Sequence, residues 1–195
     1  FRRVLFRSVY VGTPSFLKII IEKALEIGGD ISSIRCALVG AEALPPSLRS
    51  WLNEHGVPQV LQTYGSADIG NIAYETLSNG QVNPGMVLDE TLLLEIVRPG
   101  TGEPAPEGEV GEVVITSFNT DYPLIRFATG DLSAVLPDIS PCGRTNTRIK
   151  GWMGRADQTT KVRAMFVHPS QVADIVRRHP VIRKARLVIT GEMAN

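Results

Sequence analysis

The sequence has no excess of charge of either sign. Its 20 basic side chains balance 20 acidic ones over 195 residues. A balanced chain produces no long-range field that would attract nucleic acid or an anionic membrane surface. No apolar run approaches the roughly 20 residues that a membrane-spanning helix needs, and no secretory signal is visible. We therefore expect no nucleic-acid partner and no membrane association. The composition is that of an ordinary globular protein with a sizeable core.

Cysteine is also scarce. Cys36 and Cys142 lie far apart in the sequence, and neither belongs to a CxxC pair. A metal knuckle built on cysteine is therefore not indicated. Cys36 lies in an apolar stretch, where a buried thiol is expected. Two cysteines without partners favour a reducing compartment, and we predict a cytoplasmic protein.

The first part of the chain alternates between helix and strand patterns. Thr13-Pro14-Ser15 predicts a helix start, because a hydroxyl caps the first amides and proline is tolerated there. Apolar residues then follow the helical period until Gly28-Gly29: Phe16, Ile19, Ile20, Ala24 and Ile27. A strand over Ile34–Val39, a second helix from Pro45 to Gly56 and a strand over Val57–Leu61 follow. This order predicts a parallel α/β sheet.

Two loops follow the predicted strands of this sheet, at Gly40–Leu44 and Tyr64–Asp68. Open α/β sheets bind ligands at the carboxyl ends of their strands, so both loops lie on the expected face. A Tyr-Gly pair lets the backbone approach a flat ligand while the ring covers one side. Asp68 then offers a carboxylate for a divalent cation or a sugar hydroxyl. The alternative interpretation is a structural turn between two strands.

The second part of the chain is rich in β-strand patterns. Thr91–Arg98 and Glu112–Phe118 predict strands around a long hairpin tip, and a turn at Ala128–Asp131 separates two further strands. Beyond it we predict strands over Ile149–Met153, Thr160–Val167 and Ala185–Thr190, with a helix from Pro169 through Arg178. The predicted fold class is α/β, in three parts: a parallel-sheet α/β part at 1–80, a β-rich subdomain at 81–153, and a hinge with the start of a small α+β domain at 154–195.

Four stretches together resemble the adenylate-forming (AMP-binding) superfamily of acyl-CoA synthetases, adenylation domains and luciferases, and its phenylacetate–CoA ligase branch most of all. They are Gly40-Ala-Glu-Ala-Leu44, Tyr64-Gly-Ser-Ala-Asp68, Arg126-Phe-Ala-Thr-Gly-Asp-Leu132, and the run from Gly154-Arg-Ala-Asp157 through Lys161 to His168-Pro-Ser-Gln-Val172. The resemblance implies an ATP-dependent ligase that joins a carboxylic acid to AMP and then to the thiol of coenzyme A.

The resemblance also implies roles for particular residues. Asp131 and Arg155 would hold the ribose, Tyr64 would stack on the adenine, and Asp68 would bind Mg²⁺. Asp157 would be the hinge of the small C-terminal domain. The implied nucleotide contacts in full are Gly40, Ala41, Glu42, Tyr64, Gly65, Asp131 and Arg155. The implied cofactors are ATP, Mg²⁺ and coenzyme A. The partner would be a small aryl acid. Whether the protein forms a homodimer is left open.

The sequence departs from the family pattern in ways that leave alternatives. Ala67 replaces a hydroxyl residue, and Asp68 is one methylene shorter than the family's glutamate. The chain has no phosphate loop ending in lysine and no late adenylation lysine, so we assign it no catalytic residue and expect the segment alone to be inactive. Delivery to a carrier-protein thiol and a non-catalytic nucleotide-binding descendant remain alternatives to the acid–CoA ligase.

Overall fold

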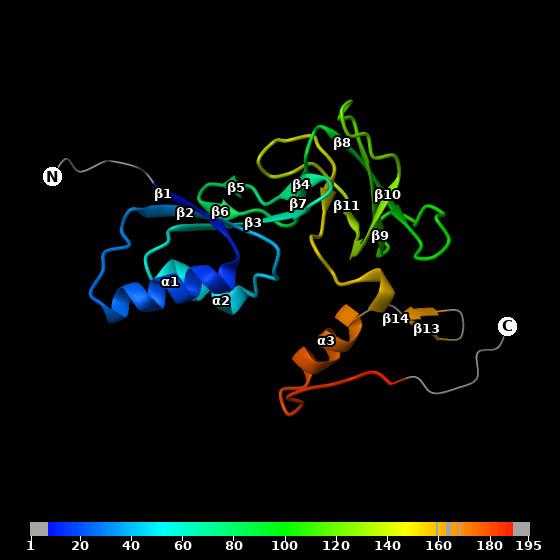
Figure 1. Ribbon diagram of the computed structural model, residues 1–195. Helices are drawn as coiled ribbons and strands as arrows, with labels where there is room; N and C mark the ends of the chain where they lie inside the picture. Colours follow the sequence, from blue (N-terminus) through cyan, green and yellow to red (C-terminus); the bar gives the residue numbers. More distant parts are fainter. Residues whose placement is uncertain (1–7, 159, 163–164, 168, 189–195) are drawn as a thin grey trace.

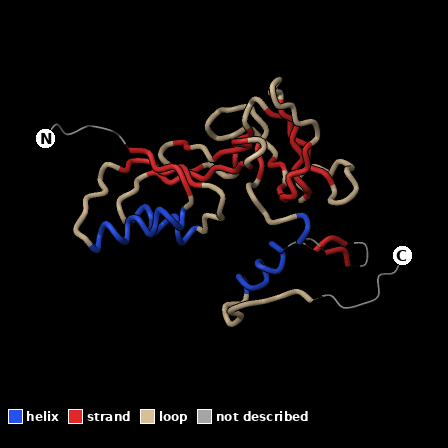
Figure 2. The backbone as a smooth tube through the Cα atoms, viewed as in Figure 1, coloured by secondary structure: helices blue, strands red, loops and turns tan. Residues whose placement is uncertain are grey.

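The computed structural model describes residues 8–158, 160–162, 165–167 and 169–188. Its first part is the predicted parallel α/β layer. Strands β1 (Ser8–Gly12), β2 (Ile34–Val39) and β3 (Gln59–Ser66) are parallel neighbours. Helices α1 (Pro14–Glu26) and α2 (Pro46–Glu54) cover the same face of this sheet (Figures 1 and 2). The predicted α/β class is therefore confirmed.

The start of α1 is as predicted, but the face that it buries is not. Thr13 is the N-cap, and its Oγ1 accepts a hydrogen bond from the amide of Phe16 at 3.4 Å. Leu17 and Ile21 are fully buried, whereas Phe16 and Ile19 are more than half exposed. Because α1 is apolar around most of its circumference, the helical period alone does not select the buried face. Leu17 and Ile21 pack with Leu52 of α2 and with the apolar side chains of β2 and β3.

The sheet changes from parallel to antiparallel after β3. Strand β4 (Gly70–Tyr74) pairs antiparallel with β3, and β7 (Met86–Leu88), β12 (Arg148–Ile149) and β11 (Val135–Leu136) continue the same sheet. The strand order is β1-β2-β3-β4-β7-β12-β11. One sheet thus joins residues on both sides of position 80, and the three-part division of the chain stays a prediction. Two short strands, β5 (Leu77–Ser78) and β6 (Gln81–Val82), form a separate hairpin.

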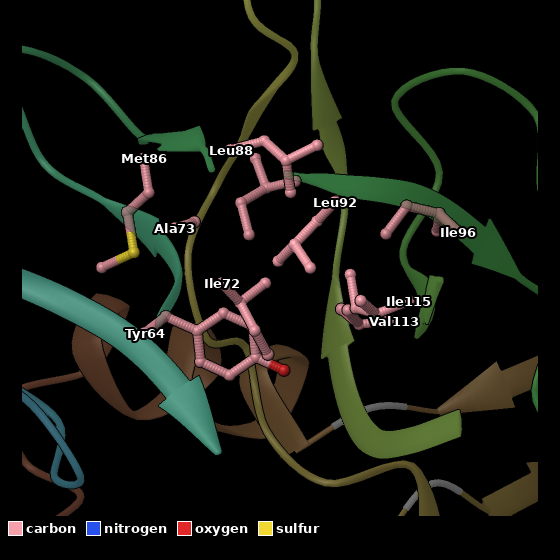
Figure 3. Close-up of a cluster of buried hydrophobic side chains, with 10 residues drawn as sticks. Tyr64, Ile72, Ala73, Met86, Leu88, Leu92, Ile96, Val113 and Ile115 are labelled. Atoms are coloured by element: carbon pink, nitrogen blue, oxygen red, sulfur yellow. The ribbon is translucent and has the colours of Figure 1, made fainter. Parts of the chain in front are cut away.

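A second sheet contains β10 (Phe127–Ser133), β9 (Gly111–Ser117) and β8 (Leu92–Val97), all antiparallel. It packs on the first sheet through a buried apolar cluster drawn in Figure 3, in which Tyr64 and Ile72 lie together with Leu92 and Ile115. The predicted turn at Ala128–Asp131 is wrong, because these residues lie inside β10. The pairing register shifts between Ala128 and Leu132, and such a bulge uses the glycine that a turn also uses.

The C-terminal part contains a 3-10 helix η1 (Ala156–Gln158), strands β13 (Thr160–Val162) and β14 (Met165–Val167), and α3 (Pro169–Arg178). The helix through Arg178 is confirmed. The single strand predicted over Thr160–Val167 is instead an antiparallel pair. The strand predicted from Ala185 is not formed over 185–188, and its last two residues lie outside the described residues, as do Arg163, Ala164 and His168.

The strand predicted over Ile149–Met153 ends early, at Ile149. Gly151 and Gly154 adopt φ values of 93° and 126°, which extended strands do not use. Segment 150–154 still follows β10, because the amide of Met153 donates to the carbonyl of Leu132 and the amide of Leu132 donates to the carbonyl of Gly154. Within the described ranges, no helix is both long enough and apolar enough to cross a membrane.

Candidate functional site

A cavity of about 390 Å³ opens at the carboxyl ends of β2 and β3. Its walls come from the loop after β2, from the end of β3, from β10 and from the segment after β12. The lining residues are Ala41, Glu42, Ala43, Gln62, Thr63, Tyr64, Gly65, Asp131 and Trp152. Five of the predicted nucleotide contacts, namely Ala41, Glu42, Tyr64, Gly65 and Asp131, are therefore brought together around one space. We had predicted a loop at Tyr64 and Gly65, but both residues belong to β3.

The loop after β2 is held tightly against the neighbouring strand. A Cβ atom on Gly40 would lie 2.9 Å from Cγ2 and 3.0 Å from the carbonyl oxygen of Thr63, so this position accepts only glycine without a shift. Gly40 thus supports the cavity without lining it. Ser15, at the start of α1, donates a hydrogen bond to Oε1 of Glu42 at 3.0 Å. The helix start and the predicted adenine loop are thereby connected.

Tyr64 joins the buried core to the cavity. Its side chain is 8% exposed and packs in the cluster of Figure 3. Its hydroxyl donates to Oδ2 of Asp131 at 3.0 Å and lies 3.3 Å from Oγ1 of Thr129. Burial raises the pKa of the Tyr64 phenol above its ordinary value, and the negative charge of Asp131 adds to the shift. The phenol is therefore a neutral donor at physiological pH, and its stacking on adenine stays a prediction.

Asp131 is the residue on which the polar contacts of the site converge. Its Oδ1 accepts hydrogen bonds from Nε1 of Trp152 at 3.0 Å and from Nη1 of Arg155 at 3.2 Å. The same Arg155 nitrogen also donates to the carbonyl of Thr129 at 3.1 Å. The amide of Asp131 donates to Oγ1 of Thr129, which in turn donates to the carbonyl of Val113. The structure thus holds the carboxylate in one orientation, next to the predicted arginine.

Gly130 allows this arrangement. Its φ is 73°, in the left-handed region, and a Cβ atom there would lie 2.5 Å from Nη2 of Arg155. The guanidinium therefore lies directly on the backbone of the β10 bulge. The bulge brings the Asp131 carboxylate and the Arg155 guanidinium together beside the cavity. Bulges commonly position side chains in this way next to functional sites.

The predicted metal ligand and the predicted hinge lie outside the cavity walls. Asp68 is exposed in the turn between β3 and β4. In the described part of the chain, no group of three or more His, Cys, Asp or Glu side chains could hold a metal ion. A single carboxylate still fits Mg²⁺ that is held mainly by substrate phosphates and water. Asp157 lies on η1 with a side chain 71% exposed, and its Oδ1 is 3.5 Å from Nε of Arg155.

Sequence reasoning missed two features of the site. The sequence motifs assigned Trp152 no role in the site, but it is 47% exposed and lines the cavity. The glycines on either side of the Trp152-Met153 pair were the available signal. The second feature is a largely buried ion pair, in which Nη2 of Arg49 lies 2.7 Å from Oε1 of Glu75. Glu75 also accepts a hydrogen bond from the amide of Gln62 at 2.7 Å, so the pair is tied to the first half of β3.

Solved structures of an acyl-CoA ligase share this fold. A 2-hydroxyisobutyryl-CoA ligase in an open conformation, in complex with 2-HIB-AMP and CoA, gives a TM-score of 0.75 at 24% identity, covering 87% of this chain and 41% of that one. The same ligase in its thioesterification state, with the same two ligands, gives a TM-score of 0.67 at 26% identity, covering 87% and 37%. The fold is therefore that of the adenylate-forming enzymes.

Sequence comparison leads to the same class. The phenylacetate–coenzyme A ligase of Thermus thermophilus is 30% identical over 186 residues, which cover 92% of this chain and 41% of that protein. The family model described as AMP-binding enzyme matches residues 7–120, more than half of the chain. The chain belongs to the AMP-binding enzyme family, as the four sequence motifs predicted. Because it spans 41% of the length of the Thermus relative, the activity of the whole protein is a matter of proposal.

Proposed function

We propose that these residues belong to an ATP-dependent acid–CoA ligase that activates an aryl acid of the phenylacetate kind. The observation that carries the proposal is the cavity itself. One side offers the tightly held loop at Ala41–Ala43, and the other offers the Asp131 carboxylate with Arg155 beside it. A fixed carboxylate accepts hydrogen bonds from the hydroxyls of a sugar, and a guanidinium donates hydrogen bonds to the same sugar. An adenosine nucleotide fits both sides at once.

The proposed reaction has two steps. In the first, a carboxylate oxygen of the acid attacks the α-phosphorus of ATP, and the bond to the β-phosphate oxygen breaks, releasing pyrophosphate. In the second, the sulfur of coenzyme A attacks the acyl carbon, its proton passes to solvent, and AMP leaves. Mg²⁺ near Asp68 would neutralise charge on the phosphates. Asp157 would act as the hinge between the two steps.

The residues of this chain would contribute by binding and orientation. Asp131 and Arg155 would fix the ribose. Glu42, which accepts a hydrogen bond from Ser15, would line the edge of the adenine. Tyr64 keeps Asp131 in place through its buried hydroxyl. Such positioning lowers the barrier because the reacting atoms meet in a fixed geometry. The aryl acid and the cytoplasmic location belong to the proposal as well. The name of the Thermus relative supports the acid, and the free thiols of Cys36 and Cys142 are consistent with the location.

The proposal is tested by pyrophosphate release from the full-length protein with a panel of aryl and alkyl acids, each with coenzyme A or with a carrier protein as acceptor. We expect release that depends on an aryl acid, and thioester formation with coenzyme A. Asp131→Asn, which keeps the shape of the side chain and removes its charge, should slow the release. Thioester on the carrier protein alone would instead support an adenylation domain. ATP binding without release for any acid would support the non-catalytic alternative.

A further inference from the structure

Trp152 is fixed relative to Asp131 by the backbone on both sides of it. Segment 150–154 is joined to β10, the strand that carries Asp131. The bonds that join them are Met153 N to Leu132 O at 2.9 Å, Leu132 N to Gly154 O at 2.8 Å and Ser133 Oγ to Gly151 O at 2.8 Å. Lys150 N also donates to the carbonyl of Ala134, the residue after β10, at 2.9 Å. Because both partners rest on one strand, the indole N–H stays within reach of the carboxylate whether or not a ligand is bound.

The carboxylate of Asp131 is already close to its capacity for hydrogen bonds. An ionised carboxylate has two oxygens with about four acceptor sites. Among the residues that the structure describes, side-chain donors occupy three of them, because Trp152 and Arg155 donate to Oδ1 and Tyr64 donates to Oδ2. One site on Oδ2 is left. A ribose brings two hydroxyl donors, so Asp131 accepts both only if one of its present donors leaves.

The three donors differ in how readily they leave. The Arg155 bond is charge-assisted, and its nitrogen also holds the carbonyl of Thr129. The Tyr64 hydroxyl belongs to a side chain that is 8% exposed, where an unpaired donor is costly. Trp152 is 47% exposed, so its indole N–H can bond to water once it leaves Asp131. Trp152 also lines a second cavity of about 180 Å³, which shares Ala43 and Gln62 with the first and gives the ring room to move.

We infer that Trp152 determines the sugar specificity of this cavity: its indole N–H competes with one ribose hydroxyl for Oδ1 of Asp131. A nucleotide with both hydroxyls displaces the indole, whereas a nucleotide with one hydroxyl uses the remaining site on Oδ2 and leaves the indole in place. In the parent protein, the second hydroxyl therefore gains little affinity, because its bond to Asp131 replaces an existing one. This inference rests on the proposed binding of ATP in the cavity.

The test compares ATP with 2′-deoxy-ATP in the full-length protein, with dissociation constants from titration calorimetry. Trp152→Phe keeps an aromatic ring and removes the N–H donor. We expect it to raise the preference for ATP over 2′-deoxy-ATP by about tenfold, the lower limit for one hydrogen bond to a charged acceptor. The matched control is Trp51→Phe on α2, whose ring stacks on His55 away from the cavity. It should leave the preference unchanged.

A second measurement needs no change to the cavity. The tryptophan emission of the parent should shift when ATP binds and should shift much less with 2′-deoxy-ATP, since only ATP displaces the indole. An equal preference in the parent and Trp152→Phe, or an equal emission shift with both nucleotides, would overturn the role of Trp152 while leaving ATP binding intact. Failure of every variant and of the parent to bind either nucleotide would instead overturn the proposed function.

Discussion

Gly130→Ala tests how the bulge of β10 builds the site. The substitution has two separate effects that the structure allows us to estimate. At φ 73°, an alanine in the left-handed region costs about 1–2 kcal/mol of stability. The new Cβ would also lie 2.5 Å from Nη2 of Arg155. Because that atom ends a flexible side chain, the guanidinium moves away and the backbone stays in place.

The displaced guanidinium loses its hydrogen bonds to Oδ1 of Asp131 and to the carbonyl of Thr129. Hydrogen bonds to charged groups contribute about 1.5–3 kcal/mol each. The Arg155 side chain is 42% exposed, so water offsets part of that contribution and we take the lower limit. A loss of about 1.5 kcal/mol corresponds to roughly a tenfold weaker binding of ATP.

Gly108→Ala is the matched control. Gly108 has a φ of 79°, and nothing lies within 4 Å of the Cβ that alanine would add, so the variant carries the same backbone cost without the displacement of Arg155. Thermal unfolding should show the backbone cost in both variants and a larger loss of stability for Gly130→Ala, which also breaks the Arg155 hydrogen bonds. Calorimetric titration with ATP should show weaker binding for Gly130→Ala alone. Equal ATP affinities of the two variants would refute the role that we assign to the bulge.

Three further predictions concern single side chains. Asp131→Ala and Arg155→Ala should each weaken ATP binding about tenfold to a hundredfold. The double variant should lose less affinity than the product of the two single losses, because both groups hold one ribose. Parent-like ATP affinities in titrations of both single variants would contradict this. Asp68→Asn should raise the Mg²⁺ requirement of pyrophosphate release and Asp68→Glu should be tolerated, whereas a silent Asn with a damaging Glu would rule out the metal role. A hydrogen bond with the Ser140 hydroxyl lowers the pKa of the Cys142 thiol to about 7, so its alkylation rate should be half-maximal near pH 7 and fall below it as the thiolate is protonated; a midpoint near the ordinary value of about 8.5 would contradict that hydrogen bond.

The local signals of the first part of the chain predicted its α/β class, although not strand β1. Thr13 and Pro14 define a helix start by chemistry that acts within one turn, and β2 forms where an apolar run predicted a strand. Strand β3 begins two residues later than the strand predicted from Val57 and extends into the predicted loop. The period did not identify the buried face of α1, since apolar residues lie around most of the helix. Burial of Leu17 and Ile21 follows from how α1 lies on the sheet, which is a tertiary property.

The polar contacts of the site could not be predicted from spacing alone. Tyr64 and Asp131 are 67 residues apart, and their hydrogen bond depends on the packing of the two sheets. Arg49 and Glu75 are 26 residues apart, and each taken alone is typical of a solvated surface. Trp152 gave no signal for the site, because a large aromatic ring usually packs in the core. Its position follows from the backbone bonds that segment 150–154 makes with β10.

The strand β10 shows why a familiar motif was misread. Thr129-Gly130-Asp131 has the composition of a turn, because glycine and aspartate both favour one. In the structure the chain continues in the same direction, and the glycine is used for a bulge. A bulge leaves almost the same local signature as a turn, and only the pairing partner β9 distinguishes them. The functional assignment of the motif did not depend on this distinction, since it came from the family resemblance.

The central claim is that an adenosine nucleotide binds in the cavity between the loop at Ala41–Ala43 and Asp131. A crystal structure of the full-length protein with AMP tests it most directly. We predict the ribose hydroxyls within hydrogen-bond distance of the Asp131 carboxylate, the adenine against Glu42 and Tyr64, and the indole of Trp152 no longer bonded to Oδ1. AMP bound at a different place, with Asp131 still holding its three present donors, would contradict the claim.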